Sequence, residues 1–451
     1  MLAFNDGFIV HQLRVPSSIA NQSNRTVQPV GGHSTQMFSA SAEMEWFRQQ
    51  RYAICHLREG SDYLRYLRPF QLIAGYPINP RPALSKLATV VRLLAYLTYL
   101  GTLLHKISYV LYRPEDINYV SFVSGGITVL VAVLLLMLIF TVHYDAFQQL
   151  GTFLNDRAFA RDHPLATGIR DRWYRWSNGL ILGPQCCIVL ILLQTWISRQ
   201  HLKKHTMLVV RGEPVGTEFD HFLYMSCLYF PTVGFFMGCS IVNAMLVGFL
   251  GEMELLATCL GELFETVERQ VKEEGPTGRP DSRALYWSTL HGELRRCAQR
   301  HCAIFTMLPK LQRMASFVFL QHHIFSLGLV VAGSYVTLRG PALRENIVLS
   351  EYPISVVLEY FIFCQLVEKL QDMNRSIGDR LYGTEWMLKL QYSRDFQREY
   401  RSAALTIRLL IMRSQHRVRF TCGSINPVSM EKFTEFLNLS YSIVMFLLSI
   451  N

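Results

Sequence analysis

The feature that most constrains this sequence is a run of 24 residues, 119–142, that contains no charged side chain. A helix needs about 20 consecutive apolar residues to cross the hydrocarbon core of a bilayer. Only 17% of the whole chain is charged, whereas soluble globular proteins carry about 25%. The run therefore predicts a transmembrane helix, and the composition argues against a soluble enzyme of two or three domains.

Six further apolar segments bring the number of expected transmembrane helices to seven. The predicted spans are about 87–112, 119–142, 177–198, 222–251, 314–338, 352–368 and 433–451. The first span contains Arg92 and Lys106 towards its ends, where long basic side chains can extend to the interface. The sixth span is short and contains Glu359. The predicted fold class is an all-α membrane protein with seven transmembrane helices.

The basic side chains are distributed unevenly between the loops on the two sides of these spans. Of the 44 Lys and Arg residues, 35 lie in residues 1–86, 143–178, 252–313 and 368–432, and only 7 lie in residues 113–118, 199–221 and 339–352. Cytoplasmic loops carry an excess of Lys and Arg. We therefore expect a cytoplasmic N-terminus and an extracellular C-terminus, the reverse of a G-protein-coupled receptor. The net charge of +10 is assigned to membrane topology, and no nucleic-acid partner is expected.

The composition divides the chain into three regions. They are a flexible cytoplasmic tail over 1–40, a cytoplasmic pre-membrane segment over 41–86, and a seven-helix channel or receptor domain over 87–451. The tail is rich in Ser, Asn, Gln and Gly, a composition that does not support a packed core. Helical periodicity also predicts cytoplasmic anchor helices over about 252–313 and 369–432, with a helix from Thr384 to Arg413. The alternative is that these basic helices lie on anionic lipid.

The sequence contains no nucleotide-binding loop, dinucleotide fingerprint, zinc-ligand pattern or nucleophile elbow. We therefore expect no enzyme activity, no cofactor and no metal. Cys297, His301 and Cys302 lie close together, but no second ligand pair accompanies them. Glu359 is a carboxylate near the middle of a span, which is a functional hypothesis by default. The alternative for Glu359 is a buried, hydrogen-bonded partner, and the pair His322-His323 is expected to pack against neighbouring helices.

Aromatic and Met residues gather in the outer halves of several spans. The candidate ligand-binding residues among them are Phe122, Trp196, Met225, Tyr229 and Tyr360. Apolar pockets between helices suit small hydrophobic ligands. The alternative is that these side chains form an interfacial belt and pack in the core.

The last span has two faces. An apolar face contains Val444, Leu447 and Leu448, while Thr434, Asn438, Ser442 and Ser449 form a polar stripe. A polar stripe on a terminal span indicates either an aqueous pore or hydrogen bonding between helices. An apolar ring can gate a pore by dewetting. The helical phase alone leaves both interpretations open.

Three segments near the end of the chain carry a family resemblance. They are Ser376 to Tyr382 followed by Trp386, the segment Cys422-Gly-Ser, and Phe433 to Ser442 with its Ser-Tyr-Ser ending. Together they resemble the insect odorant receptors. The related gustatory receptors usually have a Thr-Tyr start and a Gln-Phe finish in the last helix, which this chain lacks.

The resemblance implies a tuning subunit of a ligand-gated, non-selective cation channel. Such a subunit would bind a small volatile hydrophobic ligand and form a tetramer with the shared co-receptor in the plasma membrane of a sensory dendrite. The last helix would line the pore, with Val444 and Leu447 at the constriction. The co-receptor has a Gln near Leu447 and a longer loop between spans four and five, and this chain has neither. The alternatives are a gustatory receptor channel, a G-protein-coupled receptor and a transporter.

Overall fold

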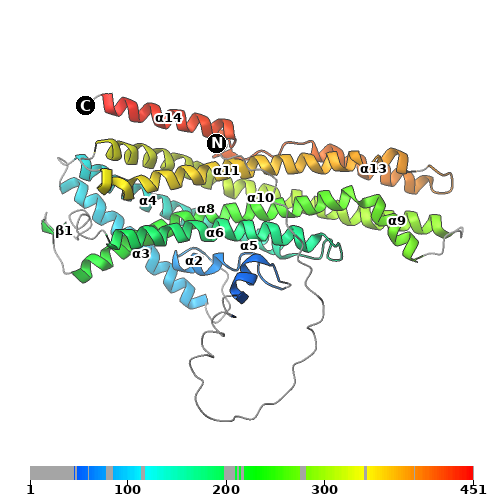
Figure 1. Cartoon of the computed structure of the whole chain (residues 1–451), viewed down its shortest axis with the longest axis horizontal. Coiled ribbons are helices and arrows are strands. Elements are labelled where there is room, and N and C mark those ends of the chain that lie inside the picture. The colour runs from blue at the N-terminus through cyan, green and yellow to red at the C-terminus, as the bar shows by residue number, and fades with distance from the viewer. Residues whose placement is uncertain are drawn as a thin grey trace, which may run out of the picture. The chain divides into compact units, whose positions relative to one another are not determined.

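The computed structural model describes residues 45, 48–58, 60–77, 85–112, 117–197, 209–210, 213–214, 218–274, 281–339, 343–390 and 392–449. The chain divides into two compact units, 1–50 and 51–451, and helices α2 to α14 all lie in the second unit. The described residues of this unit are mostly helical, with two short antiparallel hairpins (Figure 1). The predicted tail, 1–40, lies outside the described residues.

The helices account for every predicted span. Their bounds are α2 (Leu67–Ile73), α3 (Ser85–Tyr112), α4 (Ile117–Val142), α5 (Tyr144–Asn155), α6 (Ala166–Ile197), α8 (Glu218–Gly261), α9 (Leu263–Glu274), α10 (Asp281–Arg339), α11 (Leu343–Gly383), α12 (Trp386–Lys389), α13 (Gln397–Ser414) and α14 (Met430–Ser449). The hairpins pair β1 (Val209–Val210) with β2 (Glu213–Pro214), and β3 (Thr421–Cys422) with β4 (Asn426–Pro427). The spans fall on α3, α4, α6, α8, α10, α11 and α14, so the all-α fold class is confirmed.

Four segments of the described chain are long and apolar enough to cross a membrane. They are Lys86–Ser108, Val123–Val142, Phe230–Gly261 and Ser282–Tyr335. The number of seven spans and their orientation in the membrane therefore stay predictions. Large apolar side chains of α3 such as Leu93, Leu97 and Leu104 are exposed, as expected for a helix whose outer surface contacts lipid.

Helix α8 lies at the centre of the second unit. It packs against α4, α6, α10 and α11. In its most apolar stretch 94% of the residues are buried, whereas the corresponding share for α3 is 6%. Glycine residues allow this close packing, because membrane helices approach each other most closely where a residue has no side chain. A Cβ atom added to Gly234 would lie 2.9 Å from Val133 of α4, and one added to Gly248 would lie 2.7 Å from Leu154 of α5.

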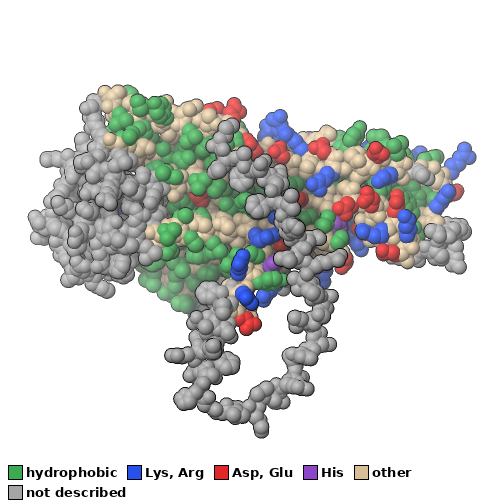
Figure 2. Space-filling model, viewed as in Figure 1, with side chains coloured by type: hydrophobic (Ala, Val, Ile, Leu, Met, Phe, Trp, Pro, Cys, Tyr) green, Lys and Arg blue, Asp and Glu red, His purple; other side chains and the backbone are tan. Residues whose placement is uncertain are grey.

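Three helices are much longer than a membrane is thick. Helix α10 has 59 residues, α8 has 44 and α11 has 41. At about 1.5 Å per residue, α10 is about 89 Å long, whereas the hydrocarbon core measures about 30 Å. The parts of α10 and α11 that extend beyond one bilayer thickness pack with α9 and α13 (Figure 1). Figure 2 shows charged side chains gathered at this end and hydrophobic side chains over the adjoining part.

The prediction of a helix from Thr384 to Arg413 is wrong. Helix α11 ends at Gly383, α12 occupies only Trp386–Lys389, and α13 begins at Gln397. Glu385 has a left-handed backbone with φ of 53°, which interrupts a helix. The change of direction buries the side chains of Trp386 and Leu390, each 3% exposed. Burial of these two apolar side chains therefore outweighs the local helical periodicity.

Two further elements differ from the loops expected between spans. Helix α5 lies inside the expected loop 143–178, and α6 begins at Ala166, well before the predicted span that starts at 177. The apolar residues of α5 are buried at helical spacing, among them Phe147, Leu150 and Leu154. A short amphipathic helix of this kind does not contain the long uncharged run that marks a span.

The close packing of α8 predicts that Gly238→Ala destabilises the protein. The added methyl group would lie 2.8 Å from both the Leu136 side chain and the Tyr76 hydroxyl, and overpacking of this kind costs about 1–3 kcal/mol. Gly183→Ala on α6 is the matched control, because nothing lies within 4 Å of its added Cβ. Thermal unfolding of both detergent-purified variants, followed by size-exclusion chromatography, measures the difference. Equal midpoints for the two variants would contradict this packing.

Candidate functional site

The last helix, α14, contacts the rest of the chain through one face only. Its buried residues are Phe433, Phe436, Ser440 and Val444, and it packs against α10 and α11. The stripe of Thr434, Asn438, Ser442 and Ser449 is exposed. At 100° per residue, this polar stripe lies about 160° around the helix from the buried face.

The candidate gate residues do not share the orientation of the polar stripe. Val444 is 6% exposed, and Leu447 and Leu448 are half-buried. The hydroxyl of Ser442 donates to the Asn438 carbonyl at 2.8 Å, and that of Thr434 donates to the Met430 carbonyl at 3.1 Å. The stripe therefore satisfies its hydroxyl donors within α14 and still presents polar atoms to whatever surrounds the helix.

The start of α14 is held by α10 and α11. The backbone N–H of Met430 donates to the Glu368 carboxylate at 2.8 Å, which satisfies one of the free N–H groups at the start of the helix. The hairpin β3–β4 is fixed by a backbone hydrogen bond of 3.0 Å from the Gly423 N–H to the Ser316 carbonyl. Gly423 has φ of 56°, a conformation that glycine adopts without steric cost.

A buried amide fixes the chain between α13 and this hairpin. The Asn374 side chain, 1% exposed, donates to the carbonyls of Ser414 at 2.8 Å and His416 at 2.9 Å. Neither Asn374 nor Glu368 is among the candidate residues that the sequence indicates. The sequence shows only that both are polar residues on a helix that continues out of a predicted span. Their partners cannot be found from it, because His416 lies 42 residues from Asn374 and Met430 lies 62 residues from Glu368.

Of the five candidate ligand-binding residues, only Tyr360 has a described side chain. Phe122 lies on α4, Trp196 on α6, and Met225 and Tyr229 on α8, with side chains outside the described part of the structure. Helices α4, α6 and α11 each pack against α8. The backbone therefore brings the helices that carry these five residues together, and the side-chain assignments stay predictions.

Tyr360 is part of an aromatic cluster that reaches the last helix. It is 1% exposed, and its hydroxyl lies 3.0 Å from Nδ1 of His323. Its ring centroid lies 5.0 Å from that of Phe436 and 6.0 Å from that of Phe433. Aromatic pairs at these distances contribute beyond the area they bury, so α11 and α14 are joined by a specific packing contact.

The histidine pair His322-His323 contacts two different neighbours, as expected for adjacent residues on a helix. His322 is fully buried and stacks on Phe235 of α8, with ring centroids 5.5 Å apart. The ring of His323 packs on Phe436 of α14, with centroids 5.4 Å apart, and both imidazole rings also lie near the Tyr360 ring. Glu359 is 5% exposed, and neither of its carboxyl oxygens has a hydrogen-bond partner among the described residues. The group beside this carboxylate is the Cys239 thiol of α8, and the hydrogen-bonded partner expected for Glu359 stays a prediction.

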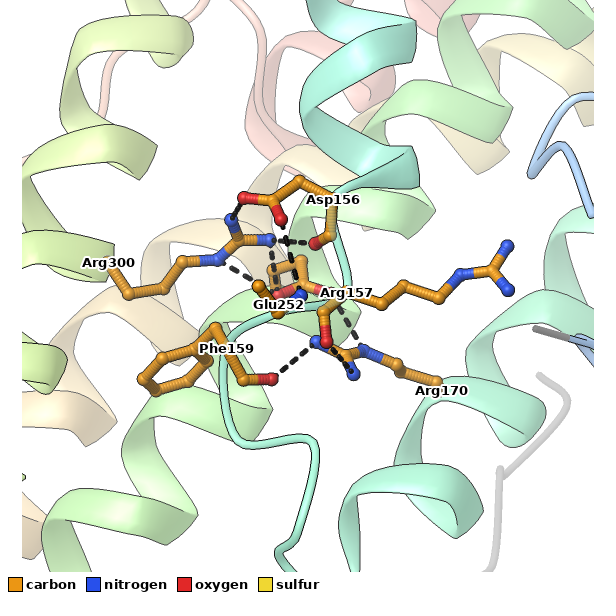
Figure 3. Close-up of polar contacts among 7 residues, drawn as sticks. Asp156, Arg157, Phe159, Arg170, Glu252 and Arg300 are labelled. Atoms are coloured by element: carbon orange, nitrogen blue, oxygen red, sulfur yellow. Dashed lines mark hydrogen bonds and ion pairs between the residues drawn. The ribbon is translucent and has the colours of Figure 1, made fainter. Parts of the chain in front are cut away.

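Arg300, Glu252, Asp156 and Arg170 form an ion-pair network between helices of the second unit (Figure 3). The Arg300 guanidinium of α10 pairs with the Glu252 carboxylate of α8 at 2.7 Å and with Asp156 at 3.1 Å. Arg170 of α6 also pairs with Glu252, at 3.2 Å. The Arg300 and Glu252 side chains are only 4% and 6% exposed. The network therefore joins α6, α8, α10 and the end of α5 at one point.

The loop after α5 supplies further acceptors to this network. Arg170 donates to the carbonyl of Phe159 at 3.0 Å, and Arg300 lies 4.3 Å from the centre of the Phe153 ring. Burial, and then the neighbouring Arg170 charge, lower the pKa of the Arg157 guanidinium. Arginine starts from a pKa so high that Arg157 keeps its charge at neutral pH.

A cavity of about 850 Å³ opens beside this network. Eight of its 20 lining residues are charged, among them Asp162, Arg269 and Glu293, and apolar residues such as Phe159 and Leu263 line the rest together with neutral polar groups. Small hydrophobic ligands occupy mainly apolar pockets with few polar groups, so this mixed lining is not the type that they favour.

The cysteines noted in the sequence do not form a metal cluster in the described structure. Cys297 is buried, whereas Cys302 is exposed and accepts a hydrogen bond from Arg413. Both ring nitrogens of His301 lack partners among the described residues.

Comparison with known proteins identifies the family. The sequence profile of the "7tm Odorant receptor" family matches residues 113–441, which is well over half of the chain. The chain therefore belongs to the odorant receptor family, and it is a multi-pass membrane protein.

Individual relatives agree with this assignment. The chain is 24% identical over 217 residues to Odorant receptor Or2 of Anopheles gambiae, covering 48% of this chain and 50% of that protein. It thus spans about half the length of this relative. The structure of the olfactory receptor OR5 of Machilis hrabei in complex with eugenol matches with a TM-score of 0.66 at 13% identity, over 87% of this chain and all of that one. The OR5 structure without eugenol matches with a TM-score of 0.63 at 13% identity, over 86% and 98%. These two likenesses concern the fold.

The ion-pair network predicts that Glu252→Gln strongly destabilises the protein. The substitution keeps the side-chain shape but leaves Arg170 and Arg300 facing each other without the shared carboxylate. Removing one partner of a buried ion pair costs about 3–5 kcal/mol. Thermal unfolding of the purified receptor and the yield of folded protein measure this loss.

The matched control is Glu293→Gln. Its partner Arg296 has a side chain that is 71% exposed, and exposed pairs contribute only about 0–1 kcal/mol. If both variants lost equal stability, the interpretation of Glu252 as the centre of the network would be wrong.

Proposed function

We propose that the chain is an odorant-binding tuning subunit of a ligand-gated, non-selective cation channel that it forms with the odorant receptor co-receptor. The family match over residues 113–441 supports this proposal. The similar fold of an olfactory receptor whose structure contains eugenol supports a small hydrophobic ligand. The proposal that the chain forms a channel rests on the orientation of α14. One face of this helix packs on its own chain, and the opposite face exposes a polar stripe.

The polar stripe supports a channel for a physical reason. Polar side chains in a membrane span avoid lipid, and they face either a partner helix or water. In a ring of subunits, a pore-lining face must point away from the subunit's own core. Asn438 and Ser442 meet that condition, whereas Val444 lies on the face that packs on α10 and α11. We therefore assign the conduction path to the stripe, and a gating role on the packed side to Val444 and Leu447.

The ligand would bind between helices in the outer half of the membrane. The proposed contacts are Phe122, Trp196, Met225, Tyr229 and Tyr360, carried by α4, α6, α8 and α11. Tyr360 offers a direct route to the pore helix, because its ring packs on Phe433 and Phe436 of α14. A ligand that shifts α11 would therefore change the packing of the last helix.

The first test is electrical recording from cells that express this chain, the co-receptor, or both. We expect cation currents in response to members of a volatile panel only where both chains are present. Tyr229→Ala should change the rank order of active odorants. Tyr382→Ala, at an exposed position near the end of α11, should leave the rank order unchanged. If the chain reached the cell surface together with the co-receptor and no volatile evoked a current that required both chains, the proposal would be refuted.

A second test asks which face of α14 contacts water. In Ser442→Cys, a membrane-impermeant, charged thiol reagent should reduce the odorant-evoked current by more than half, because the side chain would face the pore. Val444→Cys is the matched comparison and should be protected, since Val444 is buried against its own chain. The wild-type chain controls for its native cysteines. Block of Val444→Cys together with protection of Ser442→Cys would instead place the conduction path on the Val444 face.

A further inference from the structure

Three helices of the core each contribute one buried side chain to a single polar cluster. Cys239 comes from α8, His322 from α10 and Glu359 from α11, and their candidate ligand atoms all lie within 4.8 Å of one another. Cys239 and His322 are fully buried, and Glu359 is 5% exposed. All three lie in the interior of predicted spans, so water is not freely available to hydrate their polar atoms.

The polar atoms of this cluster are poorly satisfied by protein partners. Both carboxyl oxygens of Glu359 and Nε2 of His322 lack hydrogen-bond partners among the described residues. The remaining contact is weak, because it joins the Cys239 sulfur to Nδ1 of His322 at 3.5 Å. Buried polar groups are almost always paired, so the two unpaired carboxyl oxygens of Glu359, next to the Cys239 sulfur and Nδ1 of His322, indicate a missing ligand.

The distances fit a metal ion. Zinc binds Cys sulfur at about 2.3 Å and His nitrogen at about 2.0–2.1 Å in tetrahedral geometry. Those bond lengths place the sulfur and nitrogen ligands about 3.6 Å apart, and the observed separation of Cys239 Sγ and His322 Nδ1 is 3.5 Å. The full cluster, within 4.8 Å, is wider than a closed tetrahedral site, so metal binding would require the Glu359 carboxylate to move towards the other two ligands.

The ligand types and their charges select the metal. A thiolate, an imidazole and a carboxylate together favour zinc over calcium or magnesium, which prefer oxygen ligands alone. One thiolate and one carboxylate balance the charge of a divalent ion. A neutral site of this kind suits an apolar interior, where an unbalanced charge is costly.

The surroundings hold the imidazole in place. Phe235 stacks on the His322 ring at 5.5 Å, and Phe363 packs edge-on at 5.1 Å. The backbone of Val356 lies beside the same ring and offers an acceptor for the second ring N–H, as the outer shell of metal-bound histidines usually does.

We propose that Cys239, His322 and Glu359 bind a Zn²⁺ ion that joins α8, α10 and α11 within the membrane core. The protein supplies three ligands, and a water molecule or a donor atom of another molecule completes the tetrahedron. The ion would lock the three helices together at the level of the proposed ligand-binding region. This inference concerns metal binding and does not depend on which odorant the receptor detects.

The test measures metal in the purified full-length chain, so it requires no channel activity. After exchange into metal-free buffer and addition of ZnCl₂ followed by desalting, mass spectrometry of the elements should find one zinc ion per wild-type chain. Cys239→Ser and Glu359→Gln should each lose most of it. Cys364→Ser is the matched control. Cys364 of α11 is buried, like Cys239 of α8, but it is not part of the cluster.

A spectroscopic measurement protects the test against variants that fail to fold. Co²⁺ added to the wild-type chain should produce a thiolate-to-cobalt charge-transfer absorption, and added Zn²⁺ should abolish it. Cys364→Ser should keep this absorption. A folded wild-type chain that takes up neither zinc nor cobalt would overturn the proposal, as would a folded Cys239→Ser variant with undiminished zinc.

Discussion

The close approach of α8 to its neighbours is the constraint on which the rest of the structure depends. Glycines at positions 234, 238, 248 and 251 admit side chains of α4, α5, α6 and the segment after α2 into space where a Cβ atom would lie. Both polar sites of the core depend on this packing, because α8 carries Cys239 and Glu252. These residues are 13 positions apart, or about 20 Å along a helix. One rigid helix therefore sets the distance between the buried cluster and the ion-pair network.

The helical fold could be predicted from the sequence because a bilayer leaves the backbone few alternatives. In lipid, every N–H and C=O must be paired, which restricts spanning segments to helices or to barrel strands of about 10 residues. A 24-residue uncharged run such as 119–142 has the length of a helix. That argument does not apply outside the membrane. There, the helix expected from Thr384 to Arg413 is broken, because burying Trp386 and Leu390 decides the chain path. Helix α5 has a clear amphipathic pattern, with Phe147 and Leu150 on its buried face. With 12 residues it is too short to be found by a search for transmembrane spans.

The candidate sites divide in the same way between local and long-range information. Glu359 could be selected from the sequence, because a carboxylate inside a span is unusual in itself. Its neighbours could not, since Cys239 and His322 are 83 residues apart and no spacing rule connects ligands on separate helices. The buried ion pair of Arg300 and Glu252 could not be predicted from the sequence for the same reason. Sequence alone offers two charged residues on expected anchor helices, and only the packing of α8 on α10 shows that they meet.

Helix α11 connects these features to the last helix. Glu359 and Tyr360 are adjacent, so their side chains point about 100° apart. The first lies beside Cys239 and His322, and the second packs on Phe436 of α14. Further along the same helix, Glu368 accepts the first N–H of α14. A helix moves largely as a rigid element, and physical coupling requires contiguous contacts of this kind. Any displacement of α11 at the level of Glu359 must therefore be accommodated by α14 at two points, the aromatic contact and the helix start.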